Sequence, residues 1–143
     1  MIVTVARATG TGAPGYSETF PCKPESAQRA RLLVSVALSA WGIRELDGAG
    51  TQIVAELVNN SISHTGSRAI RVVVSRKDAT VRIGVVDRSR DVPVLGKPDG
   101  ESENGRGLLL VDALSTNWGY DRKRWGKVVW AELLNPEDLS AEV

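Results

Sequence analysis

Several residue types and patterns are scarce in this chain of 143 residues, and each scarcity excludes a class of protein. Cys22 is the single cysteine, so an intrachain disulfide is excluded and a reducing cytoplasm is the expected location. No run approaches about 18 consecutive apolar residues, which argues against a transmembrane helix, and the first residues do not resemble a signal peptide. The 18 basic and 17 acidic residues nearly cancel, so no electrostatic attraction to nucleic acid or membranes is expected.

The length and composition are those of one soluble globular domain with a substantial core. Hydrophobic residues make up 42% of the chain and charged residues 24%, and no internal repeat is visible. Residues 1–16 are rich in Gly, Thr and Pro and are expected to form a flexible N-terminal arm. The folded domain is expected over residues 17–134, followed by a C-terminal tail over residues 135–143.

The spacing of apolar residues predicts strands and helices. Apolar residues recur at intervals of three and four over residues 25–41 and 51–64, which indicates two amphipathic helices. Alternation over residues 69–86 and 118–134 indicates two hairpins, and a third helix is expected after Gly107. Hairpins make neighbouring strands antiparallel. The predicted fold class is therefore an α+β two-layer sandwich, in which three helices cover one face of a mostly antiparallel, mixed sheet.

Polar residues line one side of the second predicted helix. Glu56, Asn60 and His64 lie at i, i+4 and i+8, so they advance by about 40° per step along one edge of the helix. A solvent-facing edge would explain them. A functional site would explain them as well, because a carboxylate can orient or deprotonate a nucleophile and an amide oxygen can bind Mg²⁺ beside phosphate oxygens.

Two further segments carry residues suited to a nucleotide. Asp87 ends an apolar strand, where its carboxylate can accept hydrogen bonds from an exocyclic amine such as that of adenine, or can simply start a turn. Gly105 and Gly107 precede the third predicted helix, where backbone N–H groups and the helix dipole can face a phosphate. The full P-loop pattern is missing, and these glycines do not follow a strand as they do in dinucleotide-binding proteins.

Taken in order, these segments resemble the GHKL ATPase superfamily, which has the Bergerat fold. A helix with E-x-x-x-N, a strand ending in Asp, a loop and G-x-G-L before a helix match its N-box, G1-box and G2-box over about residues 17–134. The segments "ELVNNSISHT", "GRGLLLVDALSTNWG" and "GKVVWAEL" are most similar to the histidine-kinase-like ATP-binding proteins of actinobacteria, near the anti-sigma-factor serine kinases.

The resemblance implies ATP and Mg²⁺ as ligands and assigns roles to individual residues. Asn60 is expected to bind Mg²⁺, Glu56 to act as the base or to orient water, and Asp87 to bind the adenine amino group. The loop before the glycines is expected to form a lid over the nucleotide. The remaining nucleotide-site residues are expected to be His64, Ser89, Gly105, Arg106, Gly107 and Leu108.

The sequence departs from the family pattern at positions that are expected to contact the adenine ring and the phosphates. Ser89 and Asp91 stand where the G1-box usually has glycines, and Val128 stands where the closing strand often has a threonine that helps to hold adenine. Residues 103–104 lack the basic side chain that some serine kinases have there, and Arg106 is the candidate to replace it. These changes weaken the expectation of catalysis more than the expectation of ATP binding.

The function predicted from this resemblance is an ATP-dependent protein serine/threonine kinase that phosphorylates an anti-sigma-factor antagonist. The same protein would bind and silence a sigma factor, so the expected partners are a sigma factor and a STAS-type antagonist. The alternative is a non-catalytic module that binds ATP or ADP and acts through partner binding. No direct nucleic-acid or membrane contact is expected, and a homodimer is compatible with the sequence.

Overall fold

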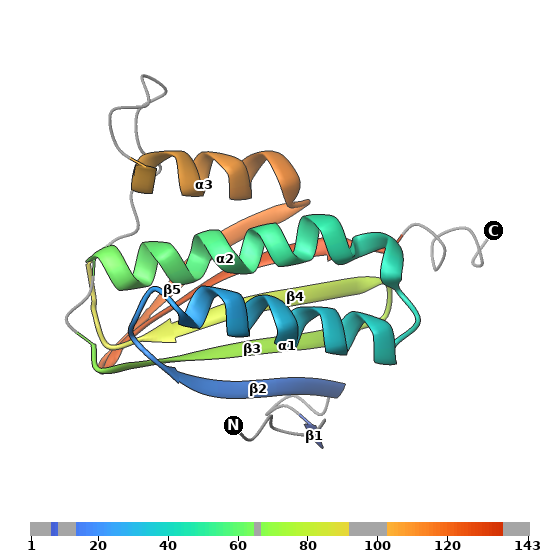
Figure 1. The fold of residues 1–143 in the computed structure, drawn as a ribbon, viewed down its shortest axis with the longest axis horizontal. Coiled ribbons are helices and arrows are strands. Elements are labelled where there is room, and N and C mark those ends of the chain that lie inside the picture. The colour runs from blue at the N-terminus through green and yellow to red at the C-terminus, as the bar shows by residue number, and fades with distance from the viewer. Residues whose placement is uncertain (1–6, 9–13, 65–66, 92–102, 136–143) are drawn as a thin grey trace.

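Three helices cover one face of an antiparallel sheet, as Figure 1 shows. The computed structural model of the protein describes residues 7–8, 14–64, 67–91 and 103–135. The strands are β1 (Arg7–Ala8), β2 (Pro14–Pro21), β3 (Ala69–Lys77), β4 (Thr80–Asp87), β5 (Asn117–Lys123) and β6 (Gly126–Leu134). They form a six-stranded sheet in the order β1-β2-β3-β4-β6-β5, and the described strands contain no parallel pair. The predicted α+β two-layer sandwich is confirmed, but the sheet is not mixed as expected, since every pair of its described strands is antiparallel.

The hairpin of β3 and β4 forms the centre of the sheet, and its register places apolar side chains under the helices. Val74 lies opposite Ile83, and both side chains are completely buried. Asp78 in the turn has a φ of 53°, a conformation that Asp adopts more readily than most residues do. Because alternate residues of a strand share a face, Asp87 at the end of β4 lies on the same side as Ile83, toward the helices.

The helices are α1 (Ser26–Ala40), the 3₁₀-helix η1 (Arg44–Leu46), α2 (Asp47–His64) and α3 (Glu103–Leu114). α1 and α3 pack against opposite sides of α2 (Figure 1). α2 begins before Thr51, the predicted start, because contacts hold its first turn. Ser35 Oγ donates to Asp47 Oδ1 at 2.7 Å, and Thr51 Oγ1 donates to the carbonyl oxygen of Asp47 at 2.7 Å. Residues 44–50, which precede the predicted start of this helix, are therefore helical from Arg44 onward.

α3 also begins earlier than predicted. Its first residue is Glu103, so Gly105 and Gly107 lie inside the helix and do not precede it. The inner side of α3 is apolar, and Leu108 and Val111 are completely buried in the core shared with α2.

The expected terminal segments are only partly described. β1 and the first residues of β2 lie within residues 1–16, so pairing of the sheet begins before the predicted domain start. The rest of the expected arm, most of the expected lid (92–102) and residues 136–143 lie outside the described part of the chain. Within the described residues, no helix has both the length and the apolar character that a membrane span requires.

Candidate functional site

Glu56, Asn60 and His64 follow one edge of α2 but differ in exposure. Asn60 is buried, with 4% of its surface exposed, whereas Glu56 is half-buried. His64 is the last residue of α2 and is exposed. Leu57 and Val58, which are almost completely buried, anchor this stretch of α2 in the core. The edge therefore passes from the interior at Asn60 to the surface at His64.

The carboxyl group of Glu56 is partly desolvated and lies within electrostatic reach of α1. Burial raises the pKa of Glu56 above its ordinary value, and the guanidinium of Arg31 on α1 offsets part of that rise. A carboxylate with a raised pKa binds a proton more readily, which suits it to accept one from a hydroxyl group. The position of Glu56 is therefore compatible with the role of a general base.

The carboxylate of Asp87 is the centre of a buried polar cluster built from β4, α2 and β6. Ser61 Oγ donates to Oδ2 at 2.8 Å, and Lys127 Nζ donates to Oδ1 at 3.0 Å. The backbone N–H of Ser89 donates to Oδ1 at 2.9 Å, and its carbonyl oxygen accepts from Lys127 Nζ at 3.2 Å. The side chains of Lys127 and Asp87 are 2% and 0% exposed, so they form a buried ion pair.

Gly126 brings the start of β6 close enough for this pair to form. A Cβ at Gly126 would lie 2.1 Å from the carbonyl oxygen of Asp87, so only a residue without a side chain fits there. The next residue, Lys127, is directly opposite Asp87 in the register of β4 and β6. The sequence analysis identified neither Lys127 nor Ser61 as part of the site. A usable signal for Lys127 is a Gly-Lys pair that opens an apolar strand.

The amide of Asn60 is suited to a phosphate-bearing ligand, since its nitrogen can donate to a phosphate oxygen and its oxygen is of the type that binds Mg²⁺. Its Nδ2 atom is buried and has no hydrogen-bond partner among the described residues, which is costly unless a ligand provides one. The next residue in sequence, Ser61, bonds to Asp87, so the backbone of Asn60 lies one residue from the Asp87 cluster. Across the described residues, no three His, Cys, Asp or Glu side chains are grouped to hold a metal themselves. A single amide oxygen fits Mg²⁺, which takes phosphate oxygens and water as its other ligands.

The three segments that sequence analysis singled out come together at one end of the molecule. Figure 1 shows the C-terminal end of α2, the end of β4 and the N-terminal end of α3 at the same end of the sandwich. Gly105, Arg106 and Gly107 are among the first five residues of α3 and thus lie in the part of the helix nearest to this end. Leu108 is completely buried in the core, so it supports α3 and does not line an open site.

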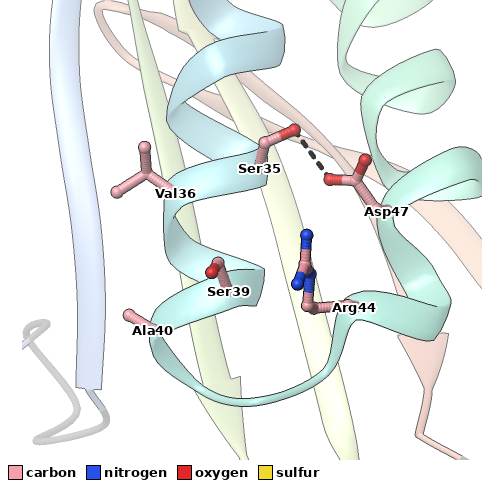
Figure 2. A pocket seen from close by; sticks show the side chains of 6 residues that line it. All are labelled: Ser35, Val36, Ser39, Ala40, Arg44 and Asp47. Atoms are coloured by element: carbon pink, nitrogen blue, oxygen red, sulfur yellow. Dashed lines mark hydrogen bonds between the residues drawn. The ribbon is translucent and has the colours of Figure 1, made fainter.

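A hollow of about 600 Å³ adjoins the Asp87 cluster through Ser89. Its lining residues are Ser67, Arg68, Ala69, Arg88 and Ser89. Another hollow, of about 570 Å³, lies beside α1 and η1 (Figure 2). Its lining residues are Ser35, Val36, Ser39, Ala40, Arg44 and Asp47. Because Asp47 and Asn60 are 13 residues apart on α2, the second hollow lies about 20 Å along the helix from Asn60 and outside the candidate site.

Comparisons with known proteins agree with this geometry. A family model described as a histidine kinase-like ATPase domain matches residues 20–133, which include α2, α3 and most of the sheet. Among solved structures, the chain is similar to the histidine kinase domain from Erythrobacter litoralis EL346 blue-light activated histidine kinase. The TM-score is 0.51 at 18% identity, over 95% of this chain and 68% of that chain, a likeness that shows the fold alone. No curated protein matches. The chain belongs to the histidine kinase-like ATPase domain family and is an ATP-binding domain of that family.

Proposed function

We propose that this ATP-binding domain is a protein serine/threonine kinase of the anti-sigma-factor type. It transfers the γ-phosphoryl group of ATP to a Ser or Thr of a STAS-type anti-sigma-factor antagonist, and it also sequesters a sigma factor. The observation that carries the proposal is Asn60, whose buried Nδ2 atom has no hydrogen-bond partner among the described residues and can donate to a phosphate oxygen, next in sequence to Ser61, which bonds to Asp87. Family membership supports ATP as the ligand, and the motif likeness supports the class of partner.

In this mechanism, the chain mainly positions the reacting groups. Asn60 would hold Mg²⁺, which would supply positive charge to neutralise the phosphates of ATP. Glu56 lies one helical turn before Asn60 and would accept the proton of the acceptor hydroxyl. The hydroxyl oxygen forms a bond to the γ-phosphorus as the bond from that phosphorus to the β–γ bridging oxygen breaks. ADP leaves, and the antagonist carries the phosphoserine or phosphothreonine.

A second candidate function is nucleotide-controlled partner binding without phosphoryl transfer. The enclosure of Asp87 favours it, because a side chain that is 0% exposed needs a local rearrangement before it can contact a base. A nucleotide would bias such a switch only through its different affinity for the two states of the protein. The residues at 103–104, which carry no basic side chain, favour it as well.

The nucleotide site is tested by calorimetric titration with ATP and with ADP, each with and without Mg²⁺. We expect wild type to bind nucleotide in a Mg²⁺-dependent manner and Asn60→Ala to lose more than about tenfold in affinity. Asn59→Ala is the matched control, because Asn59 is the adjacent amide on α2 and is less buried. Equal Mg²⁺-dependent affinity in wild type and Asn60→Ala would contradict the site assignment.

A transfer assay with γ-labelled ATP and a purified STAS-type antagonist distinguishes the kinase function from nucleotide-controlled partner binding. We expect Glu56→Gln to keep nucleotide binding and to lower the rate of phosphorylation by about a hundredfold or more, because the general base is removed. Glu45→Gln, at an exposed acid on η1, should retain the wild-type rate. Nucleotide binding without any transfer by the wild-type protein would rule out the kinase and leave the second candidate.

A further inference from the structure

The helices cover one face of the sheet (Figure 1), and cations gather on the other face at the end where β4 finishes. Arg88 directly follows Asp87, which faces the helices, so Arg88 points to the uncovered face. Gly126 lies between Arg88 and Lys123, because a Cβ on Gly126 would lie 2.7 Å from the Cα of Arg88 and Lys123 is opposite Gly126 in the register of β5 and β6. Two strand spacings, about 10 Å, therefore separate Arg88 from Lys123, with no side chain between them.

Two more arginines extend this group, so that four residues form what we call the basic rim: Arg68, Arg88, Lys123 and Arg124. Arg68 and Arg88 both line the hollow of about 600 Å³, and Arg124 follows Lys123 in the turn between β5 and β6. All four residues are exposed, and within the described part of the chain no acidic side chain forms an ion pair with them. Asp121, an exposed acid on β5, reduces these four charges without cancelling them. The fold thus concentrates positive charge on a chain that is nearly neutral as a whole.

Apolar side chains that are still accessible lie beside the basic rim. Trp125 follows Arg124 in the turn between β5 and β6 and is 51% exposed. Val86 and Val128 are opposite each other in the register of β4 and β6, on the same face as Arg88, and both are half-buried. Trp and Arg are enriched among the residues that contribute most to protein–protein binding. Cations beside accessible apolar groups match a partner segment that carries both acidic and apolar side chains.

We propose that the basic rim, together with Trp125, Val86 and Val128, is the docking surface for an acidic, partly apolar segment of a protein partner. The carboxylates of the segment pair with the guanidinium and ammonium groups, and an apolar side chain packs on the Trp125 ring. A protein fits better than a nucleic acid, because the nearly neutral chain provides no long-range attraction to a polyanion. From β3 to β5 the rim spans about 15 Å, the length of a helix of about ten residues. The proposal goes beyond the proposed function, since neither ATP binding nor phosphoryl transfer uses these residues.

The experiment measures, by fluorescence anisotropy at low salt, the binding of a labelled peptide of about ten residues made of glutamate, aspartate and leucine. Lys123→Glu/Arg124→Glu reverses two charges of the rim. Arg44→Glu/Lys77→Glu is the matched control, because it reverses two exposed cations at the opposite end of the molecule. We expect wild type and the control to bind with affinities within about threefold, and the rim variant to bind more than about tenfold more weakly. Trp125→Ala, which changes no charge, should also weaken binding by about tenfold.

Several results would overturn the proposal. Wild type that does not bind the peptide, or a rim variant that binds it as wild type does, would show that the cations are merely solvated. Unchanged affinity in Trp125→Ala would show that the apolar contact is absent. Tighter binding of a single-stranded oligonucleotide of equal charge would assign the rim to nucleic acid, and a dimer that only the rim variant loses in sedimentation would assign it to a second copy of the chain. Circular dichroism checks folding, and Trp125→Ala decides if the charge-reversal variant is unfolded. The assay contains no nucleotide, so its outcome is independent of the proposed ATP site.

Discussion

Replacing Gly126 with alanine tests whether the close approach of β6 to β4 builds the Asp87 cluster. The new Cβ would lie 2.1 Å from the carbonyl oxygen of Asp87 and 2.7 Å from the Cα of Arg88, whereas Cβ contacts under 3.0 Å essentially never occur. Neither neighbouring atom belongs to a flexible side chain. The backbone of β4 or β6 must therefore move by roughly 1 Å, as overpacked sites do.

This displacement has two energetic consequences. Overpacking costs about 1–3 kcal/mol, and the strand movement lengthens the 3.0 Å contact between Lys127 and Asp87 in a site without solvent to screen it. Removal of one partner from a buried ion pair destabilises a protein by about 3–5 kcal/mol, and lengthening the pair causes part of that destabilisation. We therefore expect Gly126→Ala to lower the free energy of unfolding by about 4 kcal/mol. At a slope of about 2 kcal/mol per molar urea, the midpoint of denaturation falls by about 2 M.

Urea denaturation followed by circular dichroism measures this change, and Gly48→Ala is its control. A Cβ at Gly48 has no atom within 4 Å, and this residue lies inside α2, so alanine should raise stability by about 0.5–1 kcal/mol. The two Gly→Ala variants should therefore shift the midpoint in opposite directions. A Gly126→Ala midpoint equal to that of wild type would refute the reasoning, because it would show that the two strands separate at no cost.

Three further predictions concern single side chains. Ser61→Ala removes the 2.8 Å hydrogen bond to Asp87 Oδ2, and we expect urea titration to show a loss of about 1–2 kcal/mol; an unchanged midpoint would mean that this bond contributes nothing. Arg82→Ala removes a guanidinium that lies 4.2 Å from the Trp130 ring centroid and 4.0 Å from Glu132 Oε2, and urea titration should show a loss of about 0.5–1 kcal/mol, mostly from the ring contact because the ion pair is partly exposed; an unchanged midpoint would mean that the ring contact contributes nothing. Because the folded-state pKa of Glu56 is raised, its contribution to stability is largest below the ordinary value of 4.5 and declines as the pH rises through the raised pKa. Glu56→Gln should remove that decline, so its stability relative to wild type should increase between acidic and neutral pH in thermal melts; a constant difference would contradict the sign.

Local sequence patterns were sufficient to predict most elements of the fold. Alternation around Val74 and Ile83 predicts both the hairpin and its buried face, because a strand with one covered face must place apolar residues at every second position. The spacing of Glu56 and Asn60 likewise places them on one edge of a helix. Helix starts were predicted less well. The start of α2 depends on a bond from Ser35 of another helix to Asp47, which no local pattern contains.

The features of the candidate site likewise fall into those that the sequence predicts and those that only the fold reveals. The sequence by itself determined which residue types could meet a nucleotide, namely Glu56 and Asn60 on α2 and Asp87 at a strand end, because helical and strand periodicity assign each to a face. Only the tertiary structure decided that Asp87 would be paired with Lys127, 40 residues away, and enclosed completely. That pairing depends on the register of β4 and β6 and on the missing side chain of Gly126, which are properties of two strands brought together by the fold and of neither strand alone.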